Sequence, residues 1–302
     1  TRFRDESEAA LTVDTARELL LSFTRRTPPI ASDPVSFVPG QLSTEEYRSA
    51  VLTAVTRVEA GAIEKVVLAR DLVGTVPAAF SVTPSIVKLS ESYPDCWTFC
   101  VEGLFGSSPE TLVSVHGHKV SARVLAGTTQ RGSDSTRDLA QAAKLASSTK
   151  DLDEHGFATR SVLDALRPFT DQLTASEAPF TLKLPNLWHL ATDISATLVP
   201  GASSLDLVAA LHPTAAVAGT PTAEAVKVIA ELEPFDRGRY AGPVGWIGAD
   251  GDGEWAIALR GAQINENLVR AFAGCGIVAE SEPDAELAET DLKFRPIREA
   301  LS

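Results

Sequence analysis

Methionine is absent from the 302-residue sequence, and cysteine is scarce. Because no methionine stands at position 1, we expect that the start of the chain has been trimmed. The three cysteines, Cys96, Cys100 and Cys275, are odd in number and widely spaced, so they do not make a disulfide framework. Such usage fits a reducing compartment, and we expect a cytoplasmic protein.

Long apolar runs and an excess of basic charge are also missing. No apolar run reaches the ~18 residues that a membrane-spanning helix needs, and no signal peptide is recognisable. The 27 basic residues stand against 40 acidic ones, which argues against nucleic-acid binding because that needs a cationic surface. An anionic small molecule is not excluded, since local lysine, arginine or Mg²⁺ can reverse the local field.

Helix and strand patterns alternate along the rest of the chain. A capping box at Ser43–Glu46 predicts a helix that ends near Gly61. The β-branched run at 65–74 predicts a strand that is apolar on both faces. Residues 242–264 predict a hairpin that turns at 250–253. Further strands are expected at 96–102, 110–116, 180–184, 187–198 and 267–273, with the segment 96–100 buried.

Further helices are predicted at 14–26, 84–93, 134–168, 203–211 and 222–233, and from about Pro283. Neighbouring strands often join by hairpins, which predicts an α+β fold with large antiparallel or mixed sheets and surrounding helices rather than a doubly wound sheet. No repeat or low-complexity linker interrupts the pattern, so we expect one domain over 1–302.

The tail 274-GCGIVAESEPDAELAETDLK-293 carries the densest chemistry. On a helix, Glu282, Glu286, Glu289 and Lys293 fall on one face. Like-charged carboxylates on one face repel unless a cation lies among them, and the preceding glycines allow close approach of another group. This pattern suggests a divalent metal that holds an anionic ligand. The alternative is a solvated acidic helix end with a Glu289–Lys293 pair.

A second acidic pair, Asp151 and Glu154, shares a face of the amphipathic segment 150–166. Two acidic faces from distant helices can complete a cage of oxygen ligands, and oxygen-only ligands favour Mg²⁺ over zinc. The alternative is again two solvated faces.

Lys65 opens an apolar strand, where burial would disfavour the charged amine and lower its pKa. A partly neutral lysine can act as a general base, although a lysine at a strand end usually reaches solvent. Glu110, in 107-SSPET-111, is either an exposed turn carboxylate or a general acid on the rim of a site.

Other candidate residues are scattered along the chain. The segment 125-LAGT-128 suits close approach of an anion, Arg260 could clamp a carboxylate bidentately, and Tyr240 could add a hydroxyl. His189 lies in an apolar strand, where a histidine is more often a satisfied core residue than a ligand.

These segments, taken in order over about residues 43–298, resemble the chorismate-utilising enzymes, a family that includes isochorismate, salicylate, anthranilate and aminodeoxychorismate synthases. The segments that carry the resemblance are KVVLAR, SPE, AGT, KDxxEH, HL, LHPTxAVxG, YAGPVGW, ALRGAQI and GCGIVAESEPDAELAETxxK. The resemblance implies a single α+β domain of two large packed antiparallel sheets. The region before Ser43 is shorter than the family's usual N-terminal portion.

The resemblance also implies roles. Glu154 and Glu289 match Mg²⁺ ligands, with Glu286 and Asp151 close by, directly or through water. Lys65 matches the base that activates water, and Glu110 matches the acid that protonates the departing C4 hydroxyl of chorismate. The residues that match substrate-binding positions are Gly127, Thr128, His189, Ala216, Tyr240, Arg260, Gly274, Gly276 and Lys293.

Three positions distinguish members of the family. Anthranilate synthases have Gln where Lys65 stands, and aminodeoxychorismate synthases have a nucleophilic lysine where Ala126 stands. Members that eliminate pyruvate usually have Thr where Ala216 stands. The resemblance therefore implies an Mg²⁺-dependent isochorismate synthase, an isomerase that feeds menaquinone or siderophore biosynthesis.

Two alternatives remain, a salicylate synthase and a non-catalytic chorismate-binding subunit. We expect no glutaminase partner, and a monomer or weak homodimer.

Overall fold

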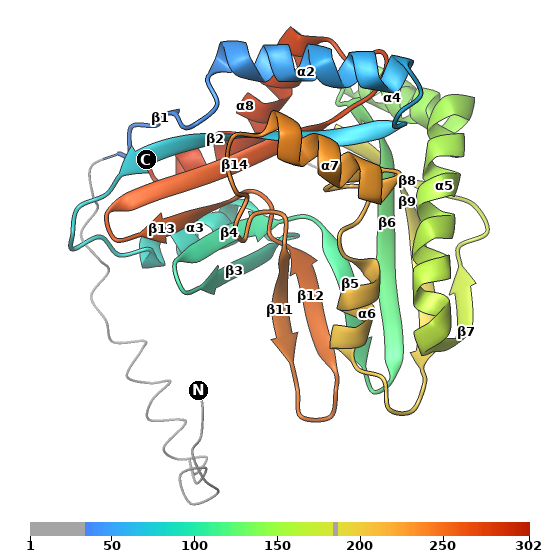
Figure 1. Ribbon diagram of the computed structural model, residues 1–302. Helices are drawn as coiled ribbons and strands as arrows, with labels where there is room; N and C mark the ends of the chain where they lie inside the picture. The colour runs from blue at the N-terminus through green and yellow to red at the C-terminus, as the bar shows by residue number, and fades with distance from the viewer. Residues whose placement is uncertain (1–33, 184–186) are drawn as a thin grey trace, which may run out of the picture.

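The structure, a computed structural model, describes residues 34–183 and 187–302, and these form two antiparallel sheets with flanking helices (Figure 1). Sheet A has the order β1 (Val38–Pro39), β2 (Lys65–Thr75), β14 (Leu268–Ile277), β13 (Gly261–Asn265), β4 (Leu104–Ser108) and β3 (Trp97–Val101), with β10 (Gly219–Thr220) beside β2. Sheet B has the order β11 (Pro243–Ile247), β12 (Gly253–Ile257), β5 (Thr111–His116), β6 (Lys119–Gln130), β9 (Leu187–Leu198) and β7 (Thr170–Ala175), with β8 (Phe180–Lys183) beside β9.

The helices are α2 (Thr44–Glu59), α3 (Thr83–Ser92), α4 (Ser135–Ser147), α5 (Thr149–Leu166), η2 (Arg167–Phe169), α6 (Ser204–Leu211), α7 (Thr222–Leu232) and α8 (Pro283–Ala300). The predicted α+β class with large antiparallel sheets is confirmed. The predicted capping box at the start of α2 is also confirmed. The helix predicted at 14–26 lies outside the described residues. Within the described residues, no helix is both long and apolar enough to cross a membrane.

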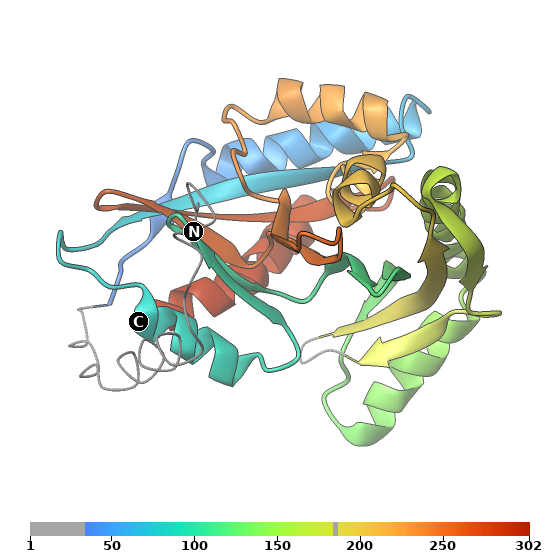
Figure 2. The ribbon, with the colours of Figure 1, turned by 90° about the horizontal axis from the view of Figure 1, so that it is seen from below.

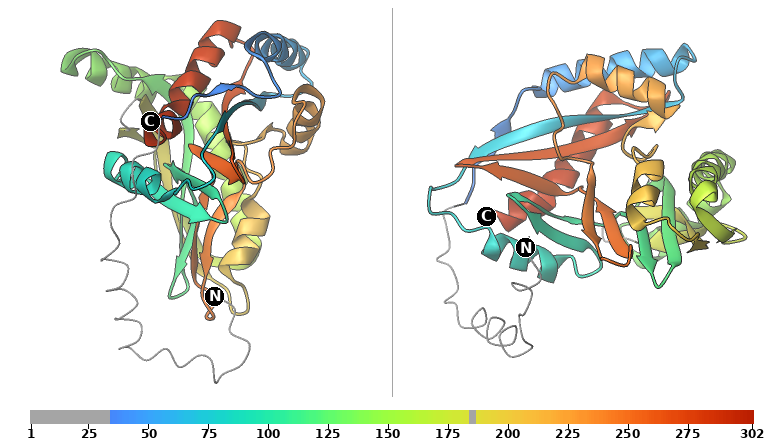
Figure 3. Two further views of the ribbon diagram at one scale, coloured as in Figure 1. Left: turned by 90° about the vertical axis from the view of Figure 1, so that its left-hand side faces the viewer. Right: turned by 60° about the horizontal axis from the view of Figure 1, so that its bottom comes forward.

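Two short segments carry the chain between the sheets. One follows β4 and leads into β5, and the other follows β12 and leads into β13. They meet where the Ile257 amide donates to the Glu110 carbonyl at 3.0 Å. Arg260 adopts the left-handed region there, with φ of 50°. Glu110 and Arg260 therefore both lie at the seam between sheets A and B. Figure 3 shows the arrangement of the two sheets from two directions.

Successive side chains of β2 point to opposite faces of sheet A, and one of these faces carries an apolar core. Val66 and Leu68 of β2 pack with α2, α7 and β14 in one apolar cluster, and Figure 2 shows α2 and α7 side by side over β2. Lys65 and Val67 point the opposite way, because successive side chains of a strand alternate between its two faces. Sheet B packs one face against α5 and α6.

Polar contacts anchor the two acidic helices. Arg70 of β2, only 2% exposed, donates to the Thr290 hydroxyl at 2.7 Å and to the Asp291 carboxylate at 2.8 Å, which ties α8 to sheet A. His155 of α5 bonds the Ala126 carbonyl at 3.0 Å and the Thr192 hydroxyl at 2.7 Å, which ties α5 to β6 and β9.

Some local predictions were wrong. The segment 96–100 forms β3 at an edge of sheet A, where Trp97 and Cys100 are exposed rather than buried. Residues 107–108, predicted as a turn, belong to the buried strand β4. The predicted hairpin with its turn near 250–253 is confirmed as β11 and β12 of sheet B, but the last residues of the predicted range, 261–264, belong to β13 of sheet A. Local patterning does not reveal which sheet a strand joins.

We predict that Asp71→Ala destabilises the fold by roughly 3 kcal/mol, because removing one partner of a buried polar network leaves the others unpaired. Asp71 is 0% exposed, accepts from the Gln41 amide at 2.9 Å and pairs with Arg270 at 2.8 Å. Asp284→Ala is the control, because its ion pair with Arg48 lies at the surface and should contribute less than about 1 kcal/mol. Urea unfolding measures both, and equal losses would contradict the prediction.

Candidate active site

A cavity of about 400 Å³ lies at the seam between the sheets and gathers residues from distant parts of the chain. Its wall includes all the site residues expected from the sequence except Glu286. These are Lys65, Glu110, Gly127, Thr128, Asp151, Glu154, His189, Ala216, Tyr240, Arg260, Gly274, Gly276, Glu289 and Lys293. They come from both sheets, from α5 and α8, and from the loops after α6 and α7.

The two glycines of β14 make room for the residues packed over them. A Cβ at Gly276 would lie 2.5 Å from Cε of Lys65, and a Cβ at Gly274 would lie 3.2 Å from the Tyr240 hydroxyl. The close approach that the sequence predicted is therefore made by two side chains of the cavity wall. Any larger residue at 276 would push Lys65 from its position.

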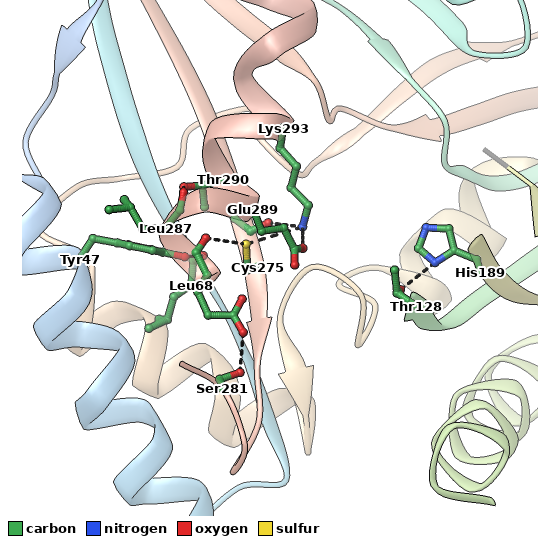
Figure 4. A network of polar contacts seen from close by, with 12 residues as sticks. Tyr47, Leu68, Thr128, His189, Cys275, Ser281, Leu287, Glu289, Thr290 and Lys293 are labelled. Carbon is green, nitrogen blue, oxygen red and sulfur yellow. Dashed lines mark hydrogen bonds and ion pairs between the residues drawn. The ribbon is translucent and has the colours of Figure 1, made fainter. Parts of the chain in front are cut away.

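Each lysine of the wall is paired with a carboxylate. Lys65 Nζ lies 3.2 Å from Glu154 of α5. Lys293 Nζ lies 2.6 Å from Glu289, a pair that Figure 4 shows. Lys293 also donates to the Gly274 carbonyl at 2.7 Å. Gly274 lies in the part of β14 that does not pair with β13. The sequence had placed Lys65 in apolar surroundings, whereas the structure gives it an acidic neighbour.

The other wall acid of α5 is Asp151, whose backbone amide is capped by the Ser148 hydroxyl at 3.3 Å. Among the described residues its carboxylate has no ion-pair partner. His155, one turn further on, is 2% exposed, and burial lowers its pKa. A neutral imidazole can donate from Nδ1 to the Ala126 carbonyl and accept at Nε2, so His155 fixes the helix that presents Asp151 and Glu154.

A bulge in β6 shapes the opposite wall. Gly127 has φ of 79°, and the β6–β9 register shifts across it, between Ala126 and Thr128. Beyond the bulge Thr128 pairs with His189, and the hydroxyl lies 2.8 Å from Nδ1 (Figure 4). Burial lowers the pKa of His189 to about 4. This ring is therefore neutral near pH 7 and can act only as a hydrogen-bonding group.

Neither Glu110 nor Arg260 has a side-chain hydrogen bond or ion pair within the described chain. Burial raises the pKa of Glu110, even though Arg260, Lys65 and Lys293 act in the opposite direction. Burial also lowers the pKa of Arg260, although a guanidinium stays a cation at neutral pH. The cavity thus combines an acid whose pKa is raised with a cation that has no ion-pair partner among the described residues.

Tyr240 lies beside these groups. Its ring stacks on Phe272 with centroids 5.1 Å apart and an interplanar angle of 17°. Burial raises the pKa of Tyr240 to about 12, so its hydroxyl stays protonated and can donate to an anion. Phe272 was not expected from the sequence, yet it precedes Gly274 and Gly276 by steps of two on the same strand face, and that spacing could have identified it.

The Glu286 side chain does not line the cavity. Its carboxylate accepts from the Ser281 hydroxyl at 2.7 Å, and burial raises its pKa. Cys275, which the sequence reasoning did not connect with the acidic helix, lies between Glu286 and Glu289, and one ligand atom from each of the three falls within 4.8 Å of the others. The one-face geometry of α8 is present, but only Glu289 of the two glutamates reaches the cavity.

We predict that Glu110→Gln changes how stability depends on pH. A carboxyl whose pKa is raised by folding holds its proton more tightly in the folded state, so stability is lost as pH rises above its ordinary value of 4.5. The free energy of unfolding of the wild type should therefore fall relative to Glu110→Gln over the pH range from 4.5 upward. Thermal unfolding across that range measures this, with the exposed Glu91→Gln as control. A constant difference would contradict the prediction.

Comparisons with known proteins agree with this geometry. The family described as "Chorismate binding enzyme" matches residues 4–302. Isochorismate synthase DhbC of Bacillus subtilis is 40% identical, with 85% of this chain and 68% of that protein covered. Isochorismate synthase EntC of Escherichia coli K12 is 38% identical, with 85% and 66% covered.

The solved structure of MenF, the menaquinone-specific isochorismate synthase of Escherichia coli, matches with a TM-score of 0.82 at 27% identity, covering 96% of this chain and 68% of that one. The chain thus spans about two thirds of the length of these relatives. Because the family matches nearly the whole sequence and the fold agrees, this chain belongs to the chorismate-binding enzymes.

Proposed function

We propose that the protein is an Mg²⁺-dependent isochorismate synthase, an isomerase that converts chorismate to isochorismate. The observation that carries this is the presence in one cavity of Lys65, of Glu110 with its raised pKa, and of the cation Arg260, which has no ion-pair partner among the described residues. The names of the relatives support the same activity.

Lys65 and Glu110 divide the proton transfers. Lys65, in its neutral form, takes a proton from water as the water oxygen bonds to C2 of chorismate. The ring double bonds shift, the C4–O bond breaks, and Glu110 gives its proton to the departing hydroxyl, which leaves as water. The atoms balance as an isomerisation, and one proton must return from Lys65 to Glu110 after each turnover. An acid whose pKa is raised by desolvation suits the second step, because it holds its proton to higher pH.

The anchoring groups suit a dicarboxylic substrate. Arg260 can form a bidentate pair with the pyruvyl carboxylate, and the Tyr240 hydroxyl can donate to the same group. Near the other end, Lys293, Thr128 and the β14 glycines line the region proposed for the ring carboxylate. Binding at both ends would fix the ring between acid and base, which lowers the entropic cost of reaction.

The donor set of the wall fits Mg²⁺. Asp151, Glu154 and Glu289 offer only carboxylate oxygens, the hard ligands that this ion prefers. Glu154 and Glu289 each form an ion pair with a lysine, and Asp151 has no cationic partner among the described residues. Glu154 and Glu289 would hold the ion, with Asp151 and Glu286 near it. A bound ion would neutralise the ring carboxylate.

Ala216 supports water addition without loss of pyruvate, on the family resemblance alone. The product would feed menaquinone or siderophore biosynthesis, since the relatives include a menaquinone-specific enzyme and one named for salicylate biosynthesis.

We predict that the pure protein converts chorismate to isochorismate with Mg²⁺, and that EDTA abolishes the conversion because the ring carboxylate is then unneutralised. Chromatography of the products measures this. Salicylate with pyruvate would move the protein to the salicylate synthases and overturn the Ala216 interpretation. No product, with chorismate still bound, would favour a non-catalytic binding subunit.

We predict that Lys65→Ala lowers kcat by about 10²–10⁴-fold, the usual contribution of a general base. Mg²⁺-dependent chorismate binding should remain within about threefold, because the anchoring groups are untouched. Lys119→Ala, at an exposed position of β6, is the control. Steady-state kinetics and calorimetric titration give both quantities, and normal turnover in Lys65→Ala would eliminate Lys65 as the base.

A further inference from the structure

The outer edge of β2 has a gap that side chains fill. β10 pairs with Lys65 and Val66, and β1 pairs with Leu72 and Val73, so the middle of this edge has no strand partner in the described chain. There the Ala69 amide donates to the Glu233 carboxylate at 2.7 Å, and Arg237 donates to the Val67 carbonyl at 2.7 Å. The Glu233–Arg237 pair therefore takes the place of a missing strand segment.

Arg237 also contacts two residues of the cavity wall, although it does not itself line the cavity. A second nitrogen of Arg237 donates to the Val217 carbonyl at 2.8 Å, and the guanidinium carbon lies 5.9 Å from the centre of the Tyr240 ring. Val217 and Tyr240 both line the cavity, whereas Arg237 and Glu233 do not. The Glu233 side chain is 2% exposed and the Arg237 side chain 16%, so water cannot easily substitute for these bonds.

We propose that Glu233 and Arg237 are positioning residues that set the distance between β2, which carries Lys65, and the wall formed by Val217 and Tyr240. This inference rests on the proposed function, because Tyr240 is there a carboxylate anchor. Only a guanidinium can bond Glu233, the Val67 carbonyl and the Val217 carbonyl at once, since its donors point in fixed, different directions. The pair acts on substrate binding through Tyr240 and touches no reacting atom.

The test is the variant Arg237→Lys, which keeps the positive charge and removes the planar guanidinium with its fixed donor directions. Loss of one charge-assisted bond behind the wall should raise the KM for chorismate about tenfold, equivalent to about 1.4 kcal/mol, with kcat within about threefold. In a Tyr240→Phe background the effect of Arg237→Lys on KM should shrink below about threefold, because the hydroxyl that it positions is gone.

Arg239→Lys is the matched control. Arg239 lies in the same segment and also donates to two backbone carbonyls, of Val101 at 3.0 Å and Glu102 at 2.7 Å, but it does not line the cavity or contact its wall through these bonds. Its KM and kcat should stay within about threefold of the wild type.

Hydrogen–deuterium exchange separates failure of this inference from failure of the proposed function. Segments 66–70 and 214–219 should exchange about tenfold faster in Arg237→Lys than in Arg239→Lys, because they lose the bonds that hold the Val67 and Val217 carbonyls and therefore open more often. A wild type that makes no isochorismate would refute the proposed function, and the exchange result would still decide the positioning role. Equal exchange in both variants, or a KM change unaffected by Tyr240→Phe, would overturn it.

Discussion

The position of Glu110 and Arg260 at the seam between the two sheets, where both residues are half-buried, is the constraint on which the site depends. Two of the segments that carry the chain between the sheets, one before β5 and one after β12, each deliver one of these residues to the same cavity. Desolvation raises the pKa of the glutamic acid, and the arginine has no ion-pair partner in the described chain. Arranging such groups in advance costs stability, but no reorganisation is then needed when an anionic ligand arrives.

The remaining charges of the wall are held in a more balanced state. The Lys65–Glu154 pair joins β2 to α5, whereas the Lys293–Glu289 pair lies within α8. These pairs hold long side chains in place in the cavity wall. Glycine at 274 and 276 of β14 leaves room for Tyr240 and Lys65, which lie against the backbone there.

Several residues outside the cavity determine its shape. Arg70 fixes α8, His155 fixes α5, and the Glu233–Arg237 pair joins the outer edge of β2 to the wall at Val217. All of these groups are buried or largely buried, and each satisfies backbone or hydroxyl groups that would otherwise be unpaired. The precision of the site therefore depends on hydrogen bonds that never contact a ligand.

The sequence by itself determined the α+β class, the capping box of α2, the strand that begins at Lys65, and the one-face spacing of Glu286, Glu289 and Lys293. These features depend on contacts a few residues apart, which local patterns report directly. The ordered motifs also identified every polar or charged residue that lines the cavity, although their roles stay predictions.

Only the tertiary structure decided the pairing of Lys65 with Glu154, 89 residues away, the turning of Glu286 toward Ser281, and the left-handed backbone of Arg260. It also decided that β13 joins sheet A instead of extending the β11–β12 hairpin of sheet B, and that β3 lies exposed at an edge of sheet A. Sheet membership and register are set by packing between segments distant in sequence, and no local pattern contains that information.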